Sequence, residues 1–136
     1  MSEVPARGEL RVVVLIAYGL FLLALVNGVT AIAGVILAYL KRDEARGTIW
    51  EGHLRNLIWV FWIGVVVACA ALALILPALS TLVFSLIATN GNPPPSLVGG
   101  LAALVPLLWL AGVIFVIWYL YRTIGGFVRA LDGKAY

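Results

Sequence analysis

The stretch VVVLIAYGLFLLALVNGVTAIAGVILAYL, Val12 to Leu40, spans 29 residues without a single Asp, Glu, Lys, Arg or His. A second such stretch, Leu57 to Tyr121, is 65 residues long. A helix crosses the hydrocarbon core of a bilayer with about 20 apolar residues, so the second stretch can hold two crossings. Hydrophobic residues make up 64% of the 136 residues and charged residues 11%, against roughly a quarter charged in soluble domains. We therefore predict an all-α membrane protein, with residues 1–136 as a single polytopic domain.

The first stretch is too long for one upright crossing. Its 29 residues would form a helix of about 43 Å, whereas the hydrocarbon core is about 30 Å thick. Asn27-Gly28, near the middle, is a dipeptide typical of turns. Two alternatives follow: one tilted helix over about residues 11–40, or a hairpin of two shorter helices broken at residues 27–30. We predict a small bundle of three to four transmembrane or half-membrane helices.

Two further crossings are predicted after the charged segment. The first covers about residues 57–76, because Pro77 ends or kinks a helix. Residues 78–89 mix apolar and hydroxyl side chains, which fits either an embedded continuation or a helix lying at the outer interface. Three consecutive prolines predict an outer loop over residues 89–96. The last crossing is predicted over about residues 97–121, with Pro106 as a candidate kink.

A charged segment, KRDEARGTIWEGHLRN at residues 41–56, separates the two apolar stretches. Lys41 and Arg42 end the preceding membrane segment. Thr48 and Glu51 have the spacing of a capping box, in which each side chain binds a backbone N–H of the first helical turn. A helix is therefore expected to begin at Thr48 and to run into the membrane.

The distribution of basic residues predicts the orientation. Residues 41–56 contain four Lys or Arg and residues 122–136 contain three, whereas the loop 89–96 contains none. Lys and Arg are in excess on the cytoplasmic side, so we expect residues 41–56 and the C-terminus in the cytoplasm and the loop 89–96 outside. Arg7 and Arg11 place the N-terminus in the cytoplasm too, which favours the hairpin. The expected location is the bacterial inner membrane.

His53 is close in sequence to acidic residues at positions 43, 44 and 51, which raises the question of a metal or acid–base site. Zinc sites use three or four N, S or O ligands, and here the single His has no usable Cys, since Cys69 falls within a membrane segment. We interpret residues 48–56 as an interfacial helix start with solvated charges. No catalytic residue, cofactor or metal is predicted, and the protein is not expected to be an enzyme.

The membrane segments offer small residues instead of charges. Their lack of ionisable groups argues against a transport path. Pairs such as Gly34-xxx-Ala38, Gly64-xxx-Ala68 and Gly99-xxx-Ala103 let helices approach closely in lipid. We therefore predict a homo-oligomer or binding to other membrane proteins. The basic residues flank apolar segments and form no stripe, so no nucleic-acid partner is expected, and contact with the lipid bilayer follows from the topology.

The segment AIAGVILAYLKRDEARGTIWEGHLRNLIWVFWIG, residues 31–64, resembles the core of the DUF4870 family of small bacterial membrane proteins. That family is related to the Tic20 family of the chloroplast import apparatus and to magnetosome proteins of the MamF type. The shared features are an apolar segment ending in YLKR, an acidic pair, and E-x-H-x-R at a helix start; YLYRTIGGFVRALDGKAY is similar to the closing helix. The resemblance implies four helices with both ends on one side, and no catalytic residue.

The sequence thus predicts a non-enzymatic scaffold or accessory subunit of a membrane complex. The alternative is a component of a protein-translocation or small-solute transport path. The candidate contacts for a partner or for lipid are Lys41, Arg42, Trp50, Glu51, His53 and Arg55. Because His53 is interpreted as solvated, its replacement is expected to leave the fold intact.

Overall fold

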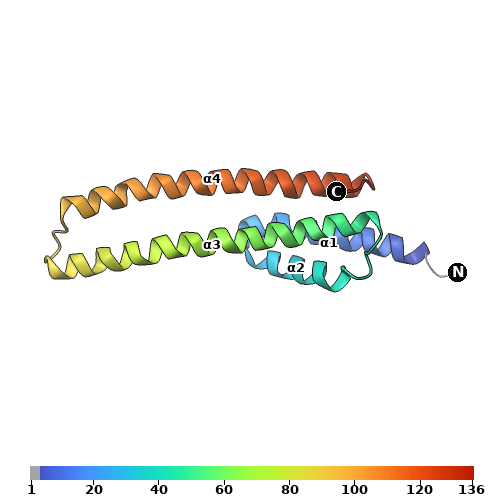
Figure 1. Ribbon diagram of the computed structural model, residues 1–136, viewed down its shortest axis with the longest axis horizontal. Helices are drawn as coiled ribbons and strands as arrows, with labels where there is room; N and C mark the ends of the chain where they lie inside the picture. Colours follow the sequence, from blue (N-terminus) through green and yellow to red (C-terminus); the bar gives the residue numbers. More distant parts are fainter. Residues whose placement is uncertain (1–3) are drawn as a thin grey trace. The chain divides into compact units, whose positions relative to one another are not determined.

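The computed structural model describes residues 4–136, with side chains described from residue 8 onward. Residues 1–3 lie outside this description. So does the side chain of Arg7, one of the basic residues from which the orientation is predicted. The described chain is all-helical, and Figure 1 shows its order: α1 (Val4–Asn27), α2 (Val29–Lys41), α3 (Ile49–Ala88) and α4 (Pro95–Leu131). Gly8–Asn27, Ile49–Ala88 and Pro95–Leu131 are long and apolar enough to cross a membrane. The predicted class, an all-α membrane protein, is confirmed.

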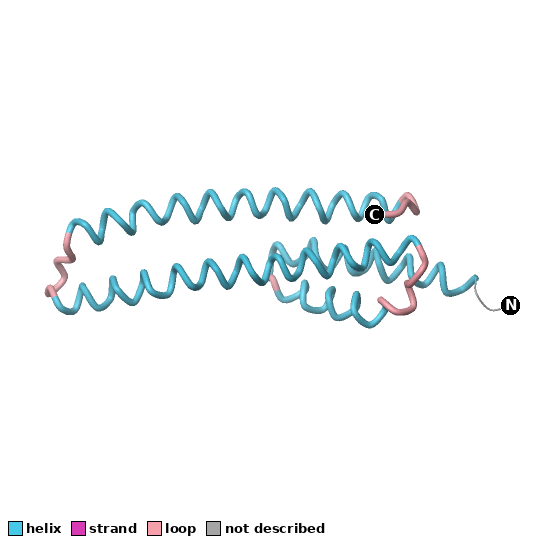
Figure 2. The backbone as a smooth tube through the Cα atoms, in the orientation of Figure 1, coloured by secondary structure: helices cyan, strands magenta, loops and turns pink. Residues whose placement is uncertain are grey.

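The chain forms two compact units. Unit 1 comprises the residues up to Ile63 together with Ile117–Tyr136, and so contains α1, α2, the start of α3 and the end of α4. Unit 2, Gly64–Val116, contains the rest of α3 and α4 and the loop that joins them. Every Asp, Glu, Lys, Arg and His of the sequence belongs to unit 1. Only short loops interrupt the helices (Figure 2).

The break in the first apolar stretch lies at Asn27-Gly28, as predicted. Gly28 has a φ of 69°, a left-handed conformation that glycine adopts without steric cost. The side-chain Oδ1 of Asn27 accepts hydrogen bonds from the backbone N–H of Thr30 at 3.3 Å and from its hydroxyl at 3.2 Å. Asn27 therefore satisfies one of the free N–H groups in the first turn of α2. At 13 residues, about 20 Å, α2 is shorter than the hydrocarbon core.

Unit 1 has a core to which all four helices contribute. α2 folds back along α1 (Figure 1), and Gly34 permits the close approach, since a Cβ there would lie 2.7 Å from the ring of Phe21. The buried positions of each helix recur at helical spacing, so each helix turns one face inward. The buried side chains of the helices are Leu10, Val14, Ala17, Tyr18 and Phe21 of α1, Val35 and Ala38 of α2, Trp50, His53, Leu54, Asn56, Leu57 and Val60 of α3, and Tyr119, Thr123 and Ala130 of α4; Ala45, in the loop before α3, is buried too.

α3 joins the helix start predicted at Thr48 to the predicted crossing 57–76, and it does not end at Pro77. It spans 40 residues, which is about 60 Å, twice the thickness of the hydrocarbon core. The helix continues to Ala88, so residues 78–88 are part of the same helix and not a separate element. Next to Pro77, the hydroxyls of Ser80 and Thr81 donate to its carbonyl oxygen at 2.9 and 2.7 Å. Such bonds help a helix to tolerate proline in lipid.

Unit 2 is a helical hairpin without a buried interior. Its loop turns at Asn90 and Gly91, which have φ values of 48° and 88°. α4 then begins at Pro95, at the first helical position, where the missing N–H has no intrahelical partner to lose. None of residues 64–116 is buried, although Gly64 lies against the ring of Phe115, 3.6 Å from the position of a Cβ. Two helices alone do not enclose a core.

Candidate functional site

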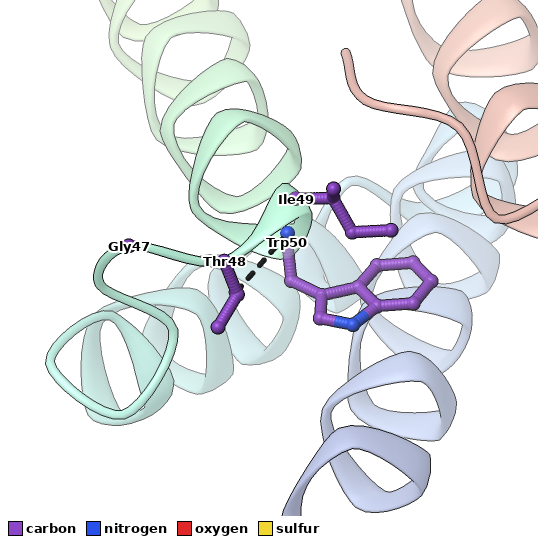
Figure 3. A pocket seen from close by; sticks show the side chains of 4 residues that line it. All are labelled: Gly47, Thr48, Ile49 and Trp50. Carbon is purple, nitrogen blue, oxygen red and sulfur yellow. Dashed lines mark hydrogen bonds between the residues drawn. The ribbon is translucent and has the colours of Figure 1, made fainter.

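The loop before α3 ends in a helix cap. The hydroxyl of Thr48 accepts the N–H of Trp50 at 3.2 Å, and the carboxylate of Glu51 accepts the N–H of Gly47 at 3.0 Å. The helix start predicted at Thr48 is therefore confirmed, although Glu51 binds the N–H one residue earlier than in a standard capping box. A pocket of about 300 Å³ lies here, and Figure 3 shows its lining residues, Gly47, Thr48, Ile49 and Trp50. The hydroxyl of Thr48 is the only one that lines the pocket. It also donates to the carbonyl of Ala45 at 2.7 Å, so it both donates and accepts within the chain.

The six predicted contact residues fall into two groups. Trp50 and His53 are buried in unit 1, with 5% and 0% of their surface exposed. The interpretation of His53 as a solvated residue is therefore wrong, because α1 and the C-terminal tail cover this face of α3. The other four keep accessible surface: Lys41, Arg42, Glu51 and Arg55.

His53 is held by hydrogen bonds at both ring nitrogens. Its Nε2 lies 2.8 Å from the backbone carbonyl oxygen of Lys134, and its Nδ1 lies 3.2 Å from the hydroxyl of Tyr18. Since a carbonyl only accepts, Nε2 carries the proton and Nδ1 accepts from the tyrosine. The amide of Asn56 donates in turn to the Tyr18 oxygen at 3.3 Å. This chain of donors joins α1, α3 and the C-terminal tail.

Aromatic rings enclose the imidazole of His53. The ring centroids of Trp50, Tyr18 and Tyr136 lie 5.8, 5.8 and 5.7 Å from its centroid. On the side of α4, Gly126 lets the Tyr18 ring approach the helix backbone, since a Cβ at this glycine would lie 2.5 Å from Cζ of Tyr18. The enclosure keeps water from competing for the hydrogen bonds.

Two further bonds join α1 to α4. The hydroxyl of Tyr119 donates to the carbonyl oxygen of Phe21 at 2.6 Å, and the guanidinium of Arg11 donates to that of Leu131 at 2.8 Å. Arg11 thereby pairs one of the last carbonyls of α4, where a positive charge interacts favourably with the helix dipole. The start of α1 and the end of α4 consequently lie at the same end of unit 1.

The cluster around His53 is suited to positioning helices. Among the described residues, no group of three His, Cys, Asp or Glu side chains lies together as a metal site would require. The Nδ1 lone pair of His53 is used by Tyr18 and its Nε2 proton by Lys134, so neither nitrogen is free to exchange a proton with a substrate. Oδ1 of Asn56 is buried without a hydrogen-bond partner.

No protein-family model, no curated protein and no solved structure matches this chain. The resemblance of residues 31–64 to the DUF4870 family thus rests on the quoted motifs alone and stays a prediction.

Three polar residues buried in the same region were not predicted from the sequence: Tyr18, Asn56 and Thr123. Tyr18 stands in an apolar stretch, where a tyrosine resembles any lipid-facing aromatic residue. Asn56 comes soon after Glu51, His53 and Arg55 and resembles part of a solvated segment. One signal was available: Asn56 lies three residues after His53, on the same face of a helix.

Proposed function

We propose that this chain is a non-enzymatic scaffold or accessory subunit of a membrane complex. The observation that carries the proposal is the character of unit 2. Its residues, 64–116, include no Asp, Glu, Lys, Arg or His, and none of them is buried. The hairpin therefore presents a largely apolar surface without a charged group, as a surface for binding other membrane helices does.

One small-residue face of unit 2 is open. Gly34 and Gly64 contact phenylalanine rings within the chain, whereas a Cβ at Gly99 or Gly100 would meet nothing within 4 Å. Small residues let the backbones of two membrane helices approach, and the dispersion contacts of that approach drive association in lipid. The pair Gly99-xxx-Ala103 on α4 is thus the face on which we place the partner helix.

Replacing Gly99 with leucine is expected to weaken the complex about tenfold, because the bulky side chain holds the partner helix away. The measurement is the stoichiometry in lipid nanodiscs by light scattering, together with cross-linking of native membranes. Gly112→Leu is the matched control. Gly112 also has open space around it. It lies 13 residues after Gly99 on α4, which rotates it by about 220° to another face of the helix.

A wild-type chain that stays monomeric in nanodiscs and cross-links to no membrane protein would contradict the scaffold role. Equal losses in Gly99→Leu and Gly112→Leu would contradict the choice of face. Solute flux through liposomes that contain only the purified chain would favour the transport alternative.

We further propose that the protein lies in the bacterial inner membrane with both termini in the cytoplasm. The bond between Arg11 and Leu131 supports this orientation, because it brings the start of α1 and the end of α4 to one end of unit 1. Basic residues flank that end, as they do on the cytoplasmic side of membrane proteins.

Reporter fusions test the orientation. Alkaline phosphatase is active only outside the cytoplasm, so we expect activity when it is fused after Gly91. Green fluorescent protein folds in the cytoplasm, so we expect fluorescence when it is fused after Tyr136. A fusion at Gly47, in the loop before α3, serves as the internal control and should fluoresce. The reverse pattern would refute the orientation.

A further inference from the structure

A pocket of about 240 Å³ lies in unit 1 beside the end of α4. Arg122, Gly126 and Arg129 are spaced by four and three residues and share one face of the helix. Because the glycines between the two arginines have no side chains, space is left between the guanidinium groups. The lining residues are Tyr121, Arg122, Gly125, Gly126, Arg129 and Tyr136.

Aromatic rings hold both arginines in place. The guanidinium carbon of Arg122 lies 5.5 Å from the ring centroid of Tyr136 and 5.9 Å from that of Trp118. The guanidinium carbon of Arg129 lies 5.7 Å from the Tyr136 centroid. Stacking on a ring restricts the guanidinium and leaves the N–H groups at its edge able to bind an acceptor. The arginines are therefore arranged before any ligand arrives.

The chain does not neutralise this pair of charges. Nε of Arg122 is buried and has no hydrogen-bond partner, so no acceptor of the chain binds it. Among residues 8–136, the ion pairs of the structure include neither Arg122 nor Arg129. The basic residues that do pair with carboxylates are Lys41, Arg46 and Lys134.

Two unneutralised guanidinium groups around one pocket select an anion, and the planar fork of arginine matches the oxygens of a phosphate group. The pocket also adjoins the end of the charge-free stretch of α4, at Tyr121. Tyr121 is 78% exposed and Trp118 lies beside Arg122, as aromatic residues do at the level of lipid headgroups. Apolar Ile117 and Ile124 are exposed next to it, where acyl chains would lie.

We propose that the pocket between Arg122, Arg129 and Tyr136 binds a phosphate group, supplied by one anionic phospholipid of the surrounding leaflet. The two guanidinium groups bind the phosphate oxygens from either side, and the bare helix at Gly125 and Gly126 makes room for the headgroup. This is a saturable site for a single lipid, unlike the diffuse attraction of a basic loop to a charged membrane. The proposal does not depend on the scaffold role.

The test is a titration of the purified chain with dioleoyl-phosphatidylglycerol, in micelles with phosphatidylcholine as background lipid, followed by native mass spectrometry. We expect one phosphatidylglycerol per chain at saturation. The double variant Arg122→Gln/Arg129→Gln should bind it about tenfold or more weakly, since two charged hydrogen-bond donors are lost. Arg46→Gln removes an exposed positive charge outside the pocket and is the matched control. A parallel titration with inorganic phosphate distinguishes a dissolved source from a lipid source.

Equal affinity of the double variant and Arg46→Gln for phosphatidylglycerol overturns the proposal. If the double variant loses binding of inorganic phosphate while its affinity for phosphatidylglycerol is unchanged, the lipid source is overturned. Helix content by circular dichroism is recorded for each variant. If the double variant does not fold, Arg129→Gln replaces it, because this side chain is exposed and outside the core. Arg122→Lys, which keeps the charge and loses the planar fork, should bind with intermediate affinity.

Discussion

Replacing Gly126 with alanine is expected to lower the free energy of unfolding by about 3 kcal/mol. The added methyl group would lie 2.5 Å from Cζ of Tyr18, and the backbone of α4 fixes its position. Tyr18 must then move, which breaks its hydrogen bonds with His53 and Asn56 and leaves buried polar groups unpaired. Unfolding by dodecyl sulfate in mixed micelles, followed by tryptophan fluorescence, measures the change.

The neighbouring glycine provides the control. A Cβ at Gly125 would meet nothing within 4 Å, and alanine is favoured over glycine inside a helix by up to about 1 kcal/mol. Gly125→Ala should therefore leave stability unchanged or raise it slightly. If Gly125→Ala and Gly126→Ala unfold at the same dodecyl sulfate concentration, the contact of Tyr18 with Gly126 does not hold α1 against α4.

The features predicted correctly from the sequence depend on short-range chemistry. Composition alone places the chain among helical membrane proteins. The turn at Asn27-Gly28 follows from a dipeptide, and the start of α3 follows from the spacing of Thr48 and Glu51. In the turn and in the helix start, the residues that determine the structure lie within four positions of one another, so no knowledge of the packing is needed.

The length of α3 was underestimated for a physical reason. In water, the N–H that Pro77 lacks and the clash of its ring commonly end a helix. In lipid, ending the helix would leave several backbone groups unpaired without water to bind them, so a continuous helix costs less free energy. The rule that proline ends a helix is therefore weaker for α3 than for a soluble helix.

The burial of His53 could not be predicted because its partners are remote in sequence. Tyr18 is 35 positions away and Lys134 is 81 positions away. Trp50, Leu54 and Leu57 do recur at helical spacing, but this spacing also fits a surface that faces the membrane interface. Both a core face and a lipid-facing surface are apolar in membrane proteins, so the pattern alone does not distinguish them.

Replacing His53 with alanine is expected to lower the free energy of unfolding by about 3 kcal/mol, contrary to the expectation from the sequence. The change removes a fully buried ring and deprives the Tyr18 hydroxyl and the Lys134 carbonyl of their partner. The C-terminal tail loses its bond to α3. We therefore also expect trypsin to cleave after Lys134 faster than in the wild type, at concentrations of denaturant too low to unfold the helices.

Arg55→Ala is the matched control for the histidine variant, because Arg55 lies two positions further along α3 and is exposed. It should change stability by no more than about 0.5 kcal/mol and leave cleavage at Lys134 unaltered. A double-mutant cycle with Tyr18→Phe then isolates the Tyr18–His53 bond, for which we expect a coupling of about 1 kcal/mol. Zero coupling would show that the Tyr18–His53 bond contributes nothing to stability. A His53→Ala variant as stable as Arg55→Ala would show that neither hydrogen bond of His53 helps to hold the helices of unit 1 together.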